Sequence, residues 1–229
     1  MYVSCAWKAV VLSIFVSTIS AVKWPAGTYT LIKPDTGCPS NWLEGWRFQD
    51  NENDNNKNRI DREHHFFGIT EQKPSNFNFS YCTKAPINLG SEGNWPPGSY
   101  CIIRHGNTCP EGFENGSIFW DDENDNNKNS VGGVLPSGQY GNDTMINYCC
   151  RRDGKFNSPI QLPTTQPFHL LKFVYPCQMV KGTNVKEIRI DFDDENDQNK
   201  DHAYGMHPFG PYPGKEDNLL VYCYYSPTK

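Results

Sequence analysis

The most regular pattern of apolar and polar positions lies in residues 188–192, where Ile, Arg, Ile, Asp and Phe alternate with a period of two. This period is typical of a half-buried β-strand, because successive side chains of a strand point to opposite faces. Segments in which Ala, Leu, Glu and Lys recur at helical spacing are few, whereas Gly, Pro, Asn and aromatic residues are frequent. The pattern therefore predicts an all-β chain without long helices.

Three acidic, amide-rich segments show that the chain is an internal repeat. Their Glu residues, Glu52, Glu123 and Glu195, are separated by 123 − 52 = 71 and 195 − 123 = 72 residues. The flanking sequence repeats at the first offset, since Trp-Pro at 24–25 returns at 95–96. The sequence thus predicts a single domain, residues 22–229, made of three copies at about 24–84, 95–151 and 162–225.

Each copy contains the same predicted strands. The first follows the Trp-Pro turn, the second leads into the acidic segment, a short third lies near the glycines after that segment, and an apolar fourth ends in Cys. The ranges are 29–33 and 100–104 for the first strand, 46–49, 117–120 and 187–192 for the second, and 77–82, 144–149 and 219–223 for the fourth. Three such units favour a pseudo-threefold, β-prism-like fold, with a β-trefoil as the alternative.

The first 21 residues follow the order of a secretory signal peptide. Lys8 precedes an apolar run at 9–16, and small residues fill 17–21. The run is shorter than the roughly 20 apolar residues of a membrane span, and no later segment is apolar enough to span. We therefore expect a secreted, extracellular protein without a membrane span. The net charge of −5 argues against nucleic acid as a partner.

The cysteines predict a disulfide framework. Removal of the signal peptide leaves eight, and an even number in an exported chain indicates disulfides. No CxxC pair is present for a structural zinc site. Each copy has one early Cys and one strand-final Cys, which suggests pairing within copies. The expected pairs are Cys38–Cys82, Cys177–Cys223, Cys109 with Cys149 or Cys150, and Cys101 with the other of these two.

The acidic segments have two interpretations. Carboxylate and amide oxygens one or two residues apart can converge on a hard cation, so Ca²⁺ is the cofactor that they suggest, although the glycine and terminal Glu of an EF-hand are absent. Alternatively, Asn and Asp side chains hydrogen-bond their own backbone and stabilise three equivalent turns. The candidate calcium ligands are Asp50, Asp54, Asp122, Asp125, Asp194 and Asp197.

Recognition of a glycan would use aromatic faces and planar polar groups. The candidate ligand-binding residues are Trp120, Asp121, Asp122, Asn124 and His207. Further aromatic candidates near the amide-rich loops are Trp42, Trp46, Trp95, Tyr204 and Tyr212, although most are expected to be core residues. Three sequons would allow N-glycosylation of an exported chain, at Asn78, Asn115 and Asn142.

We expect the chain not to be an enzyme. The carboxylates at 121–123 could form the acid and base of a glycosidase, but the same cluster occurs three times, whereas a catalytic site is generally unique. Neither a zinc-binding HExxH nor a GxSxG nucleophile sequence is present.

Several stretches carry a family resemblance: Trp-Asp-Asp-Glu-Asn at 120–124, Gly-Met-His-Pro at 205–208 and Tyr-Cys-Tyr-Tyr at 222–225. Through these, and through its eight cysteines, the chain resembles the apextrin C-terminal domain family, ApeC. A weaker likeness, limited to the order of Cys-Pro, Gly-Phe, acidic segment and Tyr-Cys, is to vitelline membrane outer layer protein I. That protein is a β-prism of three sheets, which favours the prism over the trefoil.

The ApeC resemblance implies a secreted invertebrate protein of innate immunity. Its partner would be bacterial cell-wall glycan, namely peptidoglycan or a muramyl peptide. The alternative is an apical extracellular-matrix or adhesion protein whose acidic loops bind calcium or partner proteins, and either role is compatible with a homo-oligomer. A wall hydrolase is the third hypothesis.

Overall fold

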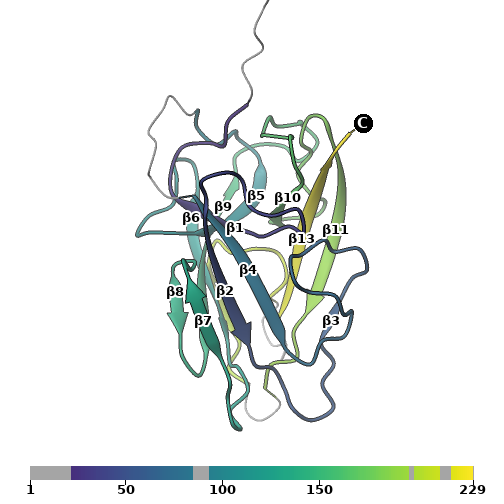
Figure 1. Cartoon of the computed structure of the whole chain (residues 1–229). Helices are drawn as coiled ribbons and strands as arrows, with labels where there is room; N and C mark the ends of the chain where they lie inside the picture. The colour runs from purple at the N-terminus through teal and green to yellow at the C-terminus, as the bar shows by residue number, and fades with distance from the viewer. Residues whose placement is uncertain (1–21, 85–92, 196–198, 212–217, 229) are drawn as a thin grey trace, which may run out of the picture.

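The computed structural model describes residues 22–84, 93–195, 199–211 and 218–228. Every regular element in these ranges is a β-strand, and none of them forms a helix that could cross a membrane. The expected signal peptide, Asp197 and Tyr212 lie outside the described residues. The predicted all-β class is confirmed (Figure 1).

The strands follow the predicted order within each copy. They are β1 (Tyr29–Ile32), β2 (Leu43–Gln49), β3 (Arg59–Ile60) and β4 (Phe77–Lys84) in copy 1. Copy 2 contains β5 (Ser99–Arg104), β6 (Glu114–Trp120), β7 (Ser130–Gly133), β8 (Gly138–Tyr140) and β9 (Thr144–Arg152). Copy 3 contains β10 (Phe168–Lys172), β11 (Thr183–Asp191), β12 (His202–Gly205) and β13 (Leu219–Pro227).

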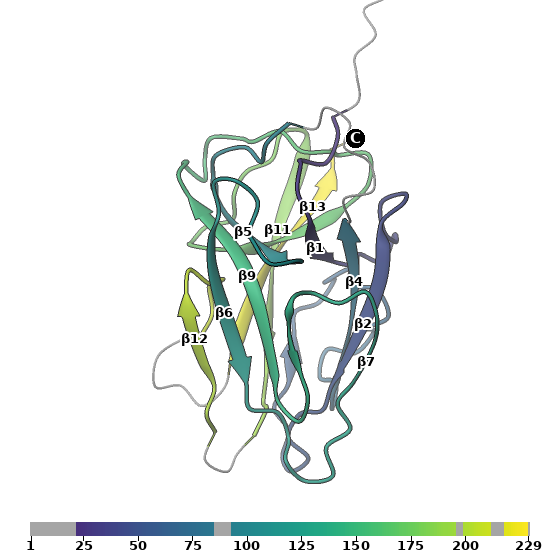
Figure 2. The same cartoon turned by 90° about the vertical axis from the view of Figure 1, so that its left-hand side faces the viewer.

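The copies exchange their short strands in a cycle. Within each copy the first, fourth and second strands pair in that order, as β1-β4-β2, β5-β9-β6 and β10-β13-β11. The outer edge of each group is then completed by a strand of another copy: β7 pairs with β2, β12 with β6, and β3 with β11. Figure 1 shows β7 beside β2, and Figure 2 shows β12 beside β6. No copy therefore completes its own group of strands.

The first strands join the three groups. β5 pairs with both β1 and β10, so all 13 strands of the described residues form one antiparallel sheet. The repeated pairing fits three equivalent units, while their prism-like arrangement stays a prediction.

Two clusters of buried side chains fill the interior. One contains Trp120 and the tyrosines that precede the strand-final cysteines, Tyr81, Tyr148 and Tyr222. The other is formed around the first strands and contains Trp95. The tyrosine position is the same in all three copies, and each of the three tyrosines is buried in the core.

The disulfides confirm the expected pairing. Four bridges are present among the described residues: Cys38–Cys82, Cys101–Cys150, Cys109–Cys149 and Cys177–Cys223. Cys149 and Cys150 hold different partners because neighbouring residues of a strand point to opposite faces, one into each core cluster.

Candidate functional site

The acidic segments join the copies in a cycle of hydrogen bonds. They follow β2, β6 and β11 and lie at the lower end of the molecule in Figures 1 and 2. In each copy the first Asp accepts a backbone N–H from the next copy. The pairs are Asp50 with Lys128 at 2.8 Å, Asp121 with Lys200 at 2.9 Å, and Asp193 with Lys57. We call this arrangement the acidic ring.

Amides within each segment hold its turn. Asn56 donates through Nδ2 to the Glu52 carbonyl at 2.7 Å, and its Oδ1 accepts the Asn58 backbone N–H at 2.8 Å. The same two bonds recur in copies 2 and 3. This is the turn-stabilising arrangement that the sequence offered as the alternative to calcium.

Two of the predicted calcium ligands, Asp122 and Asp194, approach the same Gln49 amide, but no three of them gather at one site among the described residues. No group of three or more His, Cys, Asp or Glu side chains there is arranged to hold a metal ion. Asp54 and Asp125 are exposed at the tips of their segments, whereas Asp50, Asp122 and Asp194 are buried. Calcium binding itself stays a prediction.

Polar side chains meet in the interior beneath the acidic ring. The buried Gln49 amide donates to Asp122 at 2.7 Å and to Asp194 at 3.1 Å. Asp122 also accepts the Thr144 hydroxyl at 2.6 Å. The buried Arg47 guanidinium lies 5.3 Å from the centre of the Trp120 ring, which suits a cation–π contact.

Burial sets the ionisation of these groups. It raises the pKa of Asp122 to about 6, against the opposing effect of Arg47, and raises the pKa of Asp201 to about 7. Burial also works against the charge of Arg47, yet Tyr81 and Asp122 hold its pKa above the ordinary value. The interior therefore contains a charged arginine beside acids that release their protons reluctantly.

The proposed ligand residues of the acidic segment in copy 2 mostly belong to this interior. Trp120 and Asp122 are 0 % exposed and Asp121 is 3 % exposed, so a glycan has no access to them. This corrects the expectation that Trp120 stacks on sugar. Asn124 is exposed, but its Nδ2 donates to Glu195 at 2.7 Å and thereby joins two copies.

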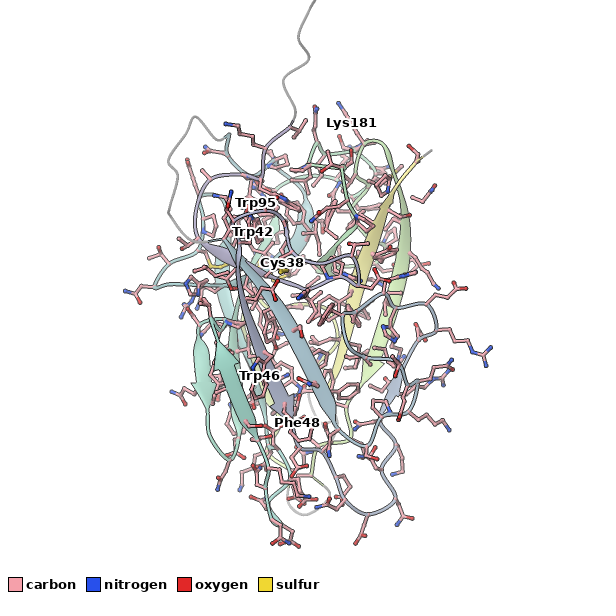
Figure 3. All side chains as sticks on the ribbon, viewed as in Figure 1. Cys38, Trp42, Trp46, Phe48, Trp95 and Lys181 are labelled. Atoms are coloured by element: carbon pink, nitrogen blue, oxygen red, sulfur yellow. A yellow bond between two sulfur atoms is a disulfide. The ribbon has the colours of Figure 1, made fainter. Side chains whose placement is uncertain are left out.

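An accessible groove lies instead on the outer face of β2, β4 and β7. It has a volume of about 480 Å³. Trp46 projects from β2, as Phe48 does two residues later (Figure 3), and Trp46 is 41 % exposed. Phe67 is 42 % exposed at the other side of the groove. Lys33, Glu44, Gly45, Asn78, Ser80 and Gly133 complete the lining of this Trp46 groove.

Two glycines allow the groove to form. A Cβ on Gly45 would lie 2.1 Å from the Val134 carbonyl oxygen, and one on Gly133 would lie 2.4 Å from that of Glu44. Gly133 also has a φ of +70°, which L-residues rarely adopt. The chain after β7 can therefore pass closely against β2. Gly116 and Gly205 occupy the equivalent places in the next group of strands.

An ion pair fixes the polar side of the groove. The Lys33 ammonium donates to Glu44 at 2.7 Å and lies 3.8 Å from the centre of the Phe67 ring. The pair Lys172–Glu187, at 2.9 Å, is its equivalent in copy 3. Because Lys33 is buried while Glu44 is exposed, the pair holds a carboxylate at the surface in a defined position.

His207 lines a second, separate pocket of about 530 Å³. The pocket lies between β6, β9 and the chain that follows β12, and its lining includes Glu114, Arg152 and Phe209. His207 is half-buried there, with its Nδ1 2.9 Å from the Pro208 carbonyl oxygen. We call this the Arg152 pocket.

The asparagines of the three sequons are exposed. Asn78 lies on β4 and faces the Trp46 groove, so a glycan there would occupy part of it. The Asn115 side chain accepts a hydrogen bond from Arg104 at 2.8 Å, and the Asn142 carbonyl accepts one from Asn127 at 2.8 Å. Glycosylation at these positions stays a prediction.

Sequence reasoning named Trp46 among the aromatic candidates but missed Lys33, Glu44 and Phe67. Phe67 reaches the groove because its backbone N–H donates to the Lys33 carbonyl at 3.0 Å, a contact between segments far apart in sequence. No local sequence pattern predicts a contact between such distant segments. The usable sequence signal for the groove is that Trp46 and Arg47 are neighbours on a strand, so that one of the two side chains must point outward.

Comparison with known proteins gives one match. A family model described as the C-terminal domain of apextrin (ApeC) matches residues 24–225, which include all three copies. No curated protein and no solved structure matches the chain.

Proposed function

Because the chain belongs to the family of apextrin C-terminal domains, we propose that it is a secreted protein of innate immunity that binds bacterial cell-wall glycan. The ligand would be peptidoglycan or a muramyl peptide. The four disulfides of the described residues support an extracellular setting, because thiols stay reduced in the cytosol. We place the binding site in the Trp46 groove.

The observation that carries this placement is a pair of exposed aromatic rings beside fixed polar groups. Trp46 and Phe67 line the same groove, and both are more than one-third exposed. A sugar ring presents an apolar face that stacks on an aromatic ring, and hydroxyls that bond to planar polar groups. Glu44 and Asn78 supply such polar groups in the groove.

Differences between the copies support a functional role for Trp46. Its equivalents in the other copies are Ser117 and Arg189, so the repeated scaffold does not require an aromatic residue at this position. Together with Phe67, Trp46 exposes aromatic surface within one groove, and grouped apolar surface of this kind is typical of binding sites. By contrast, Tyr81 and its equivalents are all tyrosines and all buried, which marks them as scaffold.

The test is a pelleting assay with insoluble peptidoglycan, using cellulose and chitin as competing glycans. We expect the oxidised, secreted chain to pellet selectively with peptidoglycan. Trp46→Ala should weaken binding roughly tenfold, about 1.4 kcal/mol. The control is Tyr204→Ala, because Tyr204 is an aromatic residue on β12 that is outside the groove and, at 66 % exposed, more accessible than Trp46.

Two further conditions sharpen the assay. Enzymatic removal of N-glycans should leave binding unchanged or strengthen it, because a glycan on Asn78 would compete for the groove. Chelation of calcium tests whether the acidic segments contribute. Failure to pellet under every condition would contradict the proposal and favour a matrix or adhesion role, and equal losses in the two variants would remove the site from the groove.

A further inference from the structure

The Arg152 pocket is preformed. A Cβ on Gly116 would lie 2.3 Å from the Met206 carbonyl oxygen, and one on Gly205 would lie 2.5 Å from that of Asn115. At Gly210 the corresponding distance, to the Leu219 carbonyl oxygen, is 1.7 Å. Only glycine fits at these three positions, so the chain after β12 is held closely against β6 and β13. Ligand binding would therefore not require the free-energy cost of ordering this wall of the pocket.

The pocket carries two opposite charges that the protein does not use elsewhere. Glu114 and Arg152 are both exposed and both line the pocket. Within the described ranges, neither side chain has a hydrogen bond or an ion pair with another residue, and the two do not form an ion pair with each other. A ligand with complementary charges could therefore bind them without displacing an internal partner.

The rest of the lining is mainly apolar. Phe173, Met206 and Phe209 supply apolar surface between the charged residues and the chain after β12. Phe209 is fixed because its backbone N–H donates to the Lys172 carbonyl at 2.8 Å and its ring lies 4.7 Å from the Lys172 ammonium. The pocket thus combines a cation, an anion and a rigid apolar wall.

The charge pair is specific to this place in the repeat. Glu114 is replaced by Leu43 in copy 1 and by Lys186 in copy 3, and Arg152 is replaced by Ser226 in copy 3. The glycines that shape the wall do recur, as Gly45 and Gly133, in the Trp46 groove. The glycines that shape the wall are therefore repeated, whereas the two charged side chains are not. This difference is expected if the pocket of one copy binds a ligand that the other copies do not bind.

We propose that the Arg152 pocket binds short zwitterionic peptides. Arg152 takes the terminal carboxylate in a bidentate hydrogen-bonded pair, Glu114 takes the terminal ammonium, and an apolar side chain packs on Phe173 and Phe209. The volume of about 530 Å³ accommodates a dipeptide better than a single amino acid. This site is independent of glycan binding in the Trp46 groove.

The test is titration calorimetry of the full chain with the dipeptide Ala-Leu and its blocked forms. Free Ala-Leu should bind, while N-acetylation and C-terminal amidation should each weaken binding at least about tenfold. Arg152→Gln should weaken free Ala-Leu similarly but leave the amide unchanged. Glu114→Gln should likewise weaken binding of free Ala-Leu but leave binding of the N-acetylated peptide unchanged. Such non-additivity identifies which charge meets which terminus.

Control variants separate this proposal from the previous one. Trp46→Ala should leave dipeptide binding unchanged, and Arg152→Gln should leave pelleting with peptidoglycan unchanged. All these residues are exposed, so the variants should fold. The proposal is overturned if about 10 mM Ala-Leu gives no binding heat with the folded chain, or if Arg152→Gln and Glu114→Gln bind free Ala-Leu as tightly as the parent does.

Discussion

Buried charge distinguishes this protein at the residue scale. Arg47, Asp122 and Asp194 are all at most 3 % exposed, although charged side chains are rarely buried unless paired. They occur at the ends of the second strands, where the three copies meet. Alternation along β2 therefore places Arg47 inside and Trp46 outside, the reverse of what polarity alone would suggest.

This inversion explains which site residues the sequence could predict. The period of two correctly separates Trp46 from its neighbour, but hydrophobicity gives no reason to expose the tryptophan. Trp120 was named as a ligand residue because aromatic faces stack on sugars, but it occupies the inward position equivalent to Gln49 and is fully buried. Choosing the face requires knowledge of the carboxylates that the other copies contribute.

Asp201 provides a test of the pH dependence. It occupies the position of Asn58 and Asn129 in the other copies, and its Oδ1 accepts the Asp121 backbone N–H at 2.7 Å as the asparagines do for their own partners. Burial raises its pKa to about 7, against about 3.9 for Asp in an unfolded chain. The folded protein therefore binds this proton more tightly, and its contribution to stability falls as pH rises from about 4 through about 7.

Asp201→Asn removes the cost of ionising a buried carboxyl group while it keeps the Oδ1 atom that accepts the Asp121 backbone N–H. We expect the variant to gain little in unfolding free energy at pH 4 and roughly 1–3 kcal/mol at pH 8, with the gain constant above about pH 7. Urea denaturation at several pH values measures it. Asp125→Asn, at an exposed position in copy 2, should change the unfolding free energy by less than about 0.5 kcal/mol throughout. A variant less stable than the parent at pH 8 would contradict the argument.

At the scale of elements, local sequence patterns predicted where the strands lie better than they predicted which strands pair with each other. The closing strands begin where an apolar run predicts them, at residues 77, 144 and 219, but each continues past the Cys that was expected to end it. The repeat assigned all the disulfides except for the choice between Cys149 and Cys150. The short strand after each acidic segment was also expected. Its pairing with another copy was not, because a segment as short as β3 carries no pattern that specifies a partner.

Two of the disulfides allow the contribution of chain entropy to the unfolding free energy to be separated from the contribution of core packing. Cys101–Cys150 and Cys38–Cys82 span 49 and 44 residues, so the chain-entropy model gives each about 4 kcal/mol. Cys101 and Cys150 are both 0 % exposed, whereas Cys38 is half-buried. Replacing the Cys101–Cys150 pair by Ala should therefore cost roughly 1 kcal/mol more than the same change in Cys38–Cys82, because it leaves a cavity in the core. Guanidinium denaturation of both double variants measures the difference, and equal losses would show that the sulfur packing contributes nothing.

At the scale of the whole molecule, the three copies depend on one another through two cyclic devices. The first is the exchange of β3, β7 and β12 between groups, and the second is the acidic ring. Both connect every copy to the other two. The acidic ring contributes no residue to the lining of the Trp46 groove or the Arg152 pocket, whereas the exchanged strands contribute Gly133 of β7 and Gly205 of β12. The repeat thus supplies a common scaffold, and its unrepeated surface residues supply the candidate chemistry.

The cyclic exchange predicts that one copy cannot fold alone. In residues 24–84, β2 would lack β7, β3 would lack β11, and Asp50 would lack the backbone N–H of Lys128. The Cys38–Cys82 bridge would remain, but it cannot replace the missing strands, because so short a chain buries too little apolar surface by itself. We expect this fragment to show narrow amide-proton dispersion and no cooperative melting, while residues 22–229 unfold in one transition. A monomeric fragment with a dispersed spectrum would show instead that each copy is a self-sufficient unit and that the exchange merely attaches the units to one another.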